Sequence, residues 1–142
     1  MKILEIFTEK RQIGNVGEKA AERYLKKKKY KILARNYVAV GNEIDLIAED
    51  KSTTVFVEVK TRTLGKENPK EPRPASAVTP DKQRKIISAA KYFLGTHRTD
   101  KRVRFDIIEV MLDEKKSVKE LCHIESAFNY NTAHPPLYSK NM

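Results

Sequence analysis

The chain has 142 residues, a length that fits one domain built around one hydrophobic core. Lys and Arg number 29 against 19 Asp and Glu, and this net charge of +10 suggests a polyanionic partner, nucleic acid before an anionic membrane surface. No apolar run approaches the roughly 18 residues of a membrane span, and Cys122, the single cysteine, excludes an intrachain disulfide and fits a reducing cytoplasm.

The first expected element is a helix over residues 12–29, preceded by a short leader that is either a loose arm or an extra turn of helix. Apolar residues recur in it every three to four positions. Glu18 precedes Ala21 by three positions and Leu25 by seven, so it lies on or beside the apolar stripe. It is either an edge residue in contact with solvent or a group directed inward.

Four consecutive lysines, residues 26–29, close this helix. They suit the negative end of the helix dipole, and this role is compatible with a contact to phosphates. A first strand over residues 30–36 is expected to follow, leading to a turn near Gly41.

Residues 42–62 predict two strands joined by a short polar turn, because apolar and polar residues alternate in both halves. If the hairpin is symmetric about Lys51–Ser52, Asp45 faces Glu58 and Glu43 faces Lys60, at about 5 Å. Two carboxylates this close repel each other unless a cation lies between them or one is protonated. A hard divalent metal is the simplest such cation.

Two alternatives stay open for this hairpin. Lys-Ser is a poor two-residue turn, so the loop could be longer, and a one-residue slip would put the two carboxylates on opposite faces. The hairpin could also present a solvated face on which Glu43 and Lys60 form an ordinary cross-strand pair. The metal site is favoured by the apolar flanks of Glu58, its convergence with Asp45 and the basic character of the domain.

Residues 63–79 form the one long segment without a helix or strand pattern. Together with Pro80, just beyond it, this segment contains four of the six prolines. Such a loop is either functional or mobile. Because it follows the charged strand directly, it is well placed to cover a bound substrate.

The second expected helix begins at Pro80, with Thr79 as its cap. Its first turns carry Lys82, Arg84 and Lys85, which are cations at the positive end of the helix dipole. This arrangement makes sense if the helix start meets phosphate. A generic basic surface is the alternative.

Two strands, over residues 103–112 and 118–124, complete the expected elements. Residues 127–128 are expected to anchor the core and the tail from Asn129 to be loose. The order helix, three strands, helix, two strands predicts an α/β fold, with a mixed sheet flanked by the two helices. We expect one domain over residues 1–142, with its core at about 12–128.

Several of these segments together match a known family. The matching segments are residues 14–18, 43–48, 56–62, 82–94 and 104–106. In this combination the chain resembles the YraN-like family of small bacterial proteins that are predicted endonucleases. More remotely, it is similar to archaeal Holliday-junction resolvases and to the restriction-endonuclease-like superfamily.

The resemblance implies a restriction-endonuclease-like fold with a metal-dependent nuclease core. Asp45 and Glu58 would be the carboxylates that bind Mg²⁺ or Mn²⁺, and Lys60 would be the catalytic lysine. Glu18 would be the helix carboxylate that completes the site. Because resolvase-like enzymes work as dimers, the resemblance also implies a homodimer.

The sequence departs from the family pattern at two turns. Asn42 separates Gly41 from Glu43, where the family commonly has Gly directly before Glu. Lys29 stands where a Gly often precedes the aromatic residue, here Tyr30. Both departures concern turns. They bear on the geometry of the loops and not on the acidic residues Glu18, Asp45 and Glu58.

We therefore expect a Mg²⁺- or Mn²⁺-dependent endonuclease that hydrolyses phosphodiester bonds in DNA, including branched or structured DNA. No motif in the sequence indicates specific contacts with base edges. We therefore expect the protein to recognise the structure of the DNA rather than its base sequence. The alternatives are a non-catalytic nucleic-acid-binding module with a vestigial acidic site, and an adaptor that docks on another protein. The residues expected to contact nucleic acid are Lys26, Lys27, Lys28, Arg62, Lys82, Arg84 and Lys85.

Overall fold

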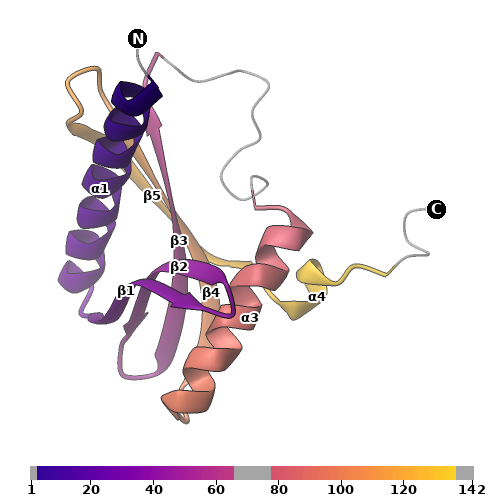
Figure 1. Ribbon diagram of the computed structural model, residues 1–142. Coiled ribbons are helices and arrows are strands. Elements are labelled where there is room, and N and C mark those ends of the chain that lie inside the picture. Colours follow the sequence, from indigo (N-terminus) through magenta and orange to yellow (C-terminus); the bar gives the residue numbers. More distant parts are fainter. Residues whose placement is uncertain (1–2, 66–77, 137–142) are drawn as a thin grey trace.

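The computed structural model describes residues 3–65 and 78–136, so most of the proline-rich segment expected at 63–79 lies outside the described residues. Its sheet has the order β1-β2-β3-β4-β5, with β3 and β4 parallel and the other neighbours antiparallel. Helices α1 and α3 cover opposite faces of this sheet (Figure 1). The mixed sheet flanked by helices confirms the α/β class. The elements are α1 (Ile3–Lys27), β1 (Lys31–Ala39), β2 (Asn42–Glu49), β3 (Thr53–Thr63), α3 (Pro80–Thr96), β4 (Arg102–Leu112), β5 (Val118–Phe128) and α4 (Tyr130–Ala133).

The core has two layers because the apolar residues of β3 alternate between the two faces of the sheet. Val57 belongs to the layer under α1, together with Leu25 and Ile108. Phe56 belongs to the layer under α3, where its ring lies 5.9 Å from that of Phe93 in an edge-to-face arrangement. These buried layers hold the strands in register up to the point where the charged residues begin.

Helix α1 lies unusually close to β3, and Gly17 makes this approach possible. A Cβ atom at this position would lie 1.8 Å from Thr61 Oγ1, a distance that no side chain tolerates. The helix also extends from Ile3, so the leader is helical over residues 3–11 rather than a loose arm. The close packing brings Glu18, the next residue, to the sheet.

The end of α1 explains one of the departures from the family pattern. Lys29 has φ 71°, in the left-handed region that glycine adopts without strain. The Tyr30 N–H then donates to the Leu25 carbonyl at 3.0 Å, which closes the helix. The turn that glycine would favour is therefore made by a lysine.

The β2–β3 hairpin has the register predicted from its symmetry about Lys51–Ser52. Leu46 pairs with Val57, and the three pairs that follow towards the turn keep the same register, which excludes the one-residue slip. The turn is made by Asp50, whose Oδ1 accepts hydrogen bonds from the N–H groups of Ser52 (2.9 Å) and Thr53 (2.8 Å). Side-chain chemistry thus replaces the Gly or Asn that a two-residue turn usually needs.

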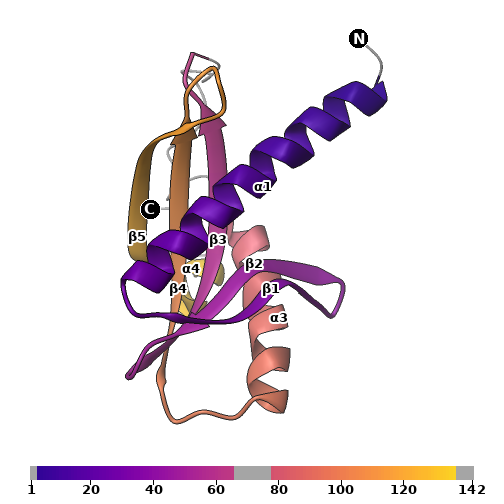
Figure 2. The same cartoon turned by 90° about the vertical axis from the view of Figure 1, so that its left-hand side faces the viewer.

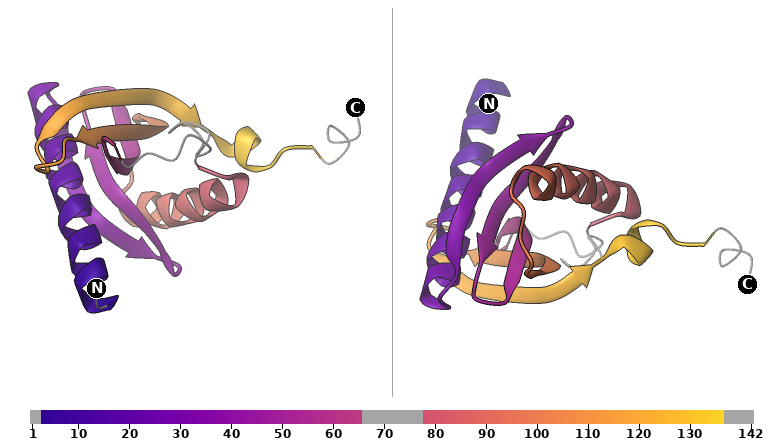
Figure 3. Two further views of the ribbon diagram at one scale, coloured as in Figure 1. Left: turned by 90° about the horizontal axis from the view of Figure 1, so that it is seen from above. Right: turned by 90° about the horizontal axis from the view of Figure 1, so that it is seen from below.

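The expectation of a loose tail from Asn129 is wrong for the residues that the structure describes there. Asn129 caps α4, which lies beside α3 (Figure 3), and the buried Ala133 joins the core cluster that contains residues of α3. Arg84 of α3 donates to the Ala133 carbonyl at 2.7 Å, and Thr132 donates to Gln83 at 2.7 Å. The sequence pattern missed this because α4 is one short turn held by polar contacts rather than by apolar periodicity.

Candidate active site

The candidate site lies where β2 and β3 part. Their ladder ends at Leu46–Val57, and beyond it the β1–β2 hairpin swings away from β3 (Figure 2). The next opposed positions in the same register are Asp45 and Glu58. The backbone N–H of Val59 donates to Asp45 Oδ2 at 2.7 Å, so the side chain of Asp45 bridges to β3 where the ladder stops.

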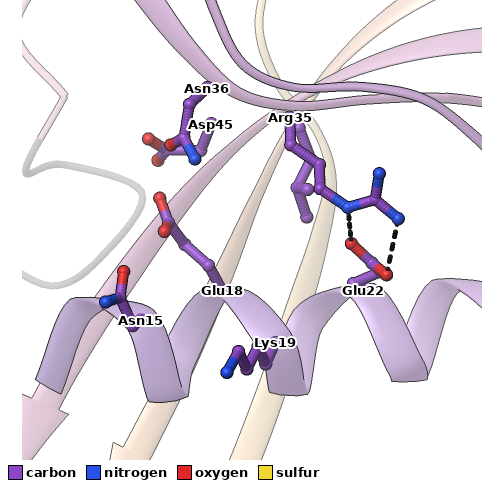
Figure 4. Close-up of a pocket in the computed structure, with 8 residues that line it drawn as sticks. Asn15, Glu18, Lys19, Glu22, Arg35, Asn36 and Asp45 are labelled. Atoms are coloured by element: carbon purple, nitrogen blue, oxygen red, sulfur yellow. Dashed lines mark hydrogen bonds and ion pairs between the residues drawn. The ribbon is translucent and has the colours of Figure 1, made fainter. Parts of the chain in front are cut away.

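Glu18 reaches this point from α1. Figure 4 shows its side chain pointing from the helix towards Asn36 and Asp45. The structure therefore brings Glu18 beside Asp45, the residue opposite Glu58, and it supports the inward rather than the solvent-facing alternative for Glu18. We call these three residues the carboxylate site. Beside them is a pocket of about 250 Å³ whose lining residues are Asn15, Glu18, Lys19, Glu22, Arg35, Asn36, Asp45 and Leu46.

The carboxylate site concentrates negative charge in a partly buried region of the protein. Burial, followed by the charges of Asp45 and Glu43, raises the pKa of Glu18 to about 7. Burial, followed by the charge of Asp45, raises the pKa of Glu58 to about 7. Burial also raises the pKa of Asp45, although the hydrogen bond from Val59 opposes this. These shifts come from burial first and from the mutual repulsion of the carboxylates second.

Two lysines border the carboxylate site. Lys60 Nζ lies 3.8 Å from Glu58 Oε1, and its side chain is 31% exposed. Among the described residues no ion pair joins Lys60 to Glu43, so the ordinary cross-strand pair considered from the sequence is not formed. The positive charge of Lys82, from the first turn of α3, lowers the pKa values of Asp45 and Glu58, as that of Lys60 does.

Asn36 is a site residue that the sequence did not indicate. It stands opposite Asp45 in the β1–β2 register and has φ 48°, a left-handed conformation that Asn tolerates. With its amide nitrogen turned to the carboxylates, it donates to Glu43 Oε1 (3.0 Å) and Glu18 Oε1 (3.1 Å). A two-residue turn at Val40–Gly41, where both φ angles are positive, sets this register and is the signal that could have revealed Asn36.

Residues 17–110 match the model of a protein family described as "Uncharacterised protein family UPF0102". A UPF0102 protein from Desulfosudis oleivorans is 43% identical over 129 residues, covering 90% of this chain and 98% of the relative. A second, from Caldanaerobacter subterraneus, is 45% identical over 121 residues, covering 84% of this chain and 96% of the relative. The chain belongs to the UPF0102 family. This confirms the resemblance to the YraN-like family.

One solved structure also aligns with this UPF0102 protein. It is an XisH family protein from Nostoc punctiforme, with 14% identity and a TM-score of 0.33, and the alignment covers 75% of this chain and 98% of the other. This likeness is too weak to bear on function. None of the helices in the described part of the chain is long and apolar enough to cross a membrane.

The donor set of the carboxylate site is suited to a hard cation that keeps part of its water shell. Within residues 3–65 and 78–136, no three His, Cys, Asp or Glu side chains form a set that could hold a metal ion. Asp45 and Glu58 offer a pair of carboxylates, and Mg²⁺ is commonly bound by one or two carboxylates and several waters. An oxygen-only pair of this kind does not suit Zn²⁺, which prefers nitrogen and sulfur ligands.

Most of the cations expected to contact nucleic acid have partners within the protein. Lys26 pairs with Glu22 (2.9 Å), Arg62 with Glu109 (3.1 Å), and Lys85 with Asp81 (3.1 Å). Arg84 donates a hydrogen bond to the Ala133 carbonyl of α4. Lys28 lies over the Tyr24 ring, 5.3 Å from its centroid. At the start of α3, Asp81 pairs with both Arg84 and Lys85. Of this set, Lys82 is the residue whose charge lowers the pKa of Asp45 and Glu58.

Proposed function

We propose that this UPF0102 protein is a Mg²⁺- or Mn²⁺-dependent endonuclease that hydrolyses phosphodiester bonds in DNA. The observation that carries the proposal is the meeting of Asp45 and Glu58, where β2 and β3 part, with Glu18 beside Asp45 and Lys60 beside Glu58. The matching motifs of the YraN-like family, and their remote similarity to resolvases and the restriction-endonuclease-like superfamily, support it.

Each side chain has a role that its surroundings favour. A divalent ion at the site would neutralise charge on the phosphate and make a water molecule nucleophilic. Asp45 and Glu58 would hold it, and Glu18 would contribute directly or through water. The hydrogen bond from Val59 fixes Asp45 in place before any ion binds. Lys60 would orient the attacking water or stabilise the negative charge that develops.

The substrate follows from charge and resemblance. A net charge of +10 attracts a polyanion without reading its bases, so recognition of DNA by shape is favoured over recognition by sequence. The remote similarity to resolvases extends the proposal to branched DNA and to a homodimer. The single cysteine, Cys122, supports a cytoplasmic setting.

The test is a cleavage screen over duplex, flap, four-way junction and single-stranded DNA, with Mg²⁺, Mn²⁺ or EDTA. We expect the wild type to cleave at least one substrate with metal and none in EDTA, and Asp45→Asn to be inactive although folded. If the wild type binds DNA but cleaves no substrate under any condition, the proposed nuclease activity is contradicted. The non-catalytic nucleic-acid-binding module would then be the remaining function. Equal cleavage by wild type and Asp45→Asn would show that the nuclease is a contaminant or that the site is wrong.

A further inference from the structure

The exposed side of α1 carries a row of polar residues spaced four apart. Residues at this spacing are neighbours on a helix surface, and each step rises about 6 Å along the axis. Every member of the row is exposed, and four of the five are cations. The row, called here the α1 row, consists of Arg11, Asn15, Lys19, Arg23 and Lys27.

Among the residues that the structure describes, no acidic side chain pairs with the cations of the α1 row, which are Arg11, Lys19, Arg23 and Lys27. The acid beside them, Glu22, is already engaged by other partners. These are Lys26 and Arg35, and their hydrogen bonds, Arg35 first, lower the pKa of Glu22 to about 2. The row therefore presents uncompensated positive charge.

The α1 row passes the carboxylate site at Asn15 and Lys19 and continues away from it through Arg23 and Lys27. Asn15 and Lys19 line the pocket beside Glu18 and Asp45 (Figure 4). Arg23 and Lys27 line a second hollow of about 250 Å³, whose other walls include Val118 and Leu121 of β5. Because α1 forms the outer layer on its face of the sheet, nothing in the described fold covers this path (Figures 1 and 3).

The opposite layer lacks such a path. The first turn of α3 has two cations that share Asp81, and Arg84 also binds the Ala133 carbonyl. Lys91 lies over the ring of Tyr130. Lys82 is the α3 cation whose charge acts on Asp45 and Glu58, whereas the row of exposed cations that continues away from the site lies on α1.

We propose that the α1 row is the track on which a DNA strand lies by its phosphates, with Lys19 next to the reacting phosphate and Lys27 farthest from it. The proposal rests on the proposed function, because it takes the carboxylate site as the place of cleavage. A row of cations rather than a base-reading surface fits backbone contacts, which position nucleic acid without selecting its sequence.

The experiment measures binding apart from cleavage, by fluorescence anisotropy of a labelled DNA duplex in EDTA over a range of salt concentrations. The test variant is Arg23→Gln with Lys27→Gln, both remote from the carboxylates. The matched control is Lys91→Gln with Arg98→Gln, which removes the same charge from α3 and from the segment that follows it. Circular dichroism and thermal melting confirm that both double variants fold.

We expect the Arg23/Lys27 variant to bind at least tenfold more weakly and to reduce the log–log salt slope by about two, one for each lost phosphate contact. The Lys91/Arg98 control should change affinity by about twofold or less, as distant charges are screened. Equal losses in the two variants, or unchanged binding by the first, would overturn the track. If the wild type binds DNA through the row in EDTA but cleaves nothing with metal, the proposed function fails and the track stands.

Discussion

Asp45 accepts a hydrogen bond of 2.7 Å from the backbone N–H of Val59, the residue that follows Glu58 on the adjacent strand. This contact takes the place of a ladder bond at the point where β2 leaves β3. It fixes one carboxylate beside another and leaves the remaining oxygens for a cation. The separation of the strands is thus what creates the site.

Replacing Asp45 by Asn should separate metal binding from folding. The amide oxygen can still accept from Val59, while the negative charge that repels Glu58 and Glu18 disappears. We expect Asp45→Asn to melt at the wild-type temperature or above in EDTA, and to lose the Mn²⁺ site seen by calorimetry in the wild type. Equal Mn²⁺ binding by the two proteins would remove Asp45 from the ligand set.

The stability of the metal-free protein should fall as pH rises through the carboxylate range. The pKa of Glu58 is raised by burial and by Asp45 from 4.5 to about 7. The folded state therefore holds this proton more tightly than the unfolded state does. The resulting stabilisation is complete below about pH 4.5 and lost as pH rises through about 7. Glu18, with its pKa raised to about 7, adds to the same trend.

The measurement is the Tm in EDTA between pH 4.5 and 8 for the wild type and Glu58→Gln. We expect the wild-type Tm to fall over this range and the variant to show a smaller fall, because Gln does not titrate. Saturating Mg²⁺ should restore the wild type at pH 8. Identical pH profiles for the two proteins would show that Glu58 is not the group responsible.

The sequence predicted the strand register that sets Asp45 opposite Glu58, but not the residues that support them. Strand alternation and symmetry about Lys51–Ser52 placed Asp45 opposite Glu58, since period-two geometry carries register over several residues. Asn36 was missed because its role depends on a left-handed residue within a strand, which no periodicity reveals. The lysine runs predicted a basic surface but not which cations are paired, because ion pairs depend on distant elements.

A second missed feature is the buried network around Asp106. This carboxylate is fully buried and accepts from His123 (2.7 Å), Arg104 (2.9 Å) and the Ser126 N–H (3.0 Å). Tyr24 of α1 joins it through His123 at 3.0 Å. No sequence pattern links His123 to these partners, because they come from another strand and from a helix far away in the chain. The network fastens the C-terminal half of α1 to β4 and β5.

Asp106→Asn should therefore destabilise the fold. The amide nitrogen of Asn would face donors, and Arg104 would lose its buried counter-charge, a loss worth about 3 kcal/mol or more. Chemical denaturation should show this as a lower midpoint, whereas Asp81→Asn, at an exposed pair, should change stability by under about 1 kcal/mol. Similar small effects in both variants would mean that the network does not hold α1.

The most direct test of the central claim is the rate at which Lys60 variants cleave the best substrate of the wild type. Lys60 is partly exposed, so Lys60→Met should leave folding and DNA affinity nearly intact. Cleavage should nevertheless drop by about a hundredfold or more, the usual loss on removing one positioned stabilising group. Lys60→Arg should not restore it, because Arg is larger and does not give up a proton. Cleavage by Lys60→Met at the wild-type rate would contradict the assignment of the active site.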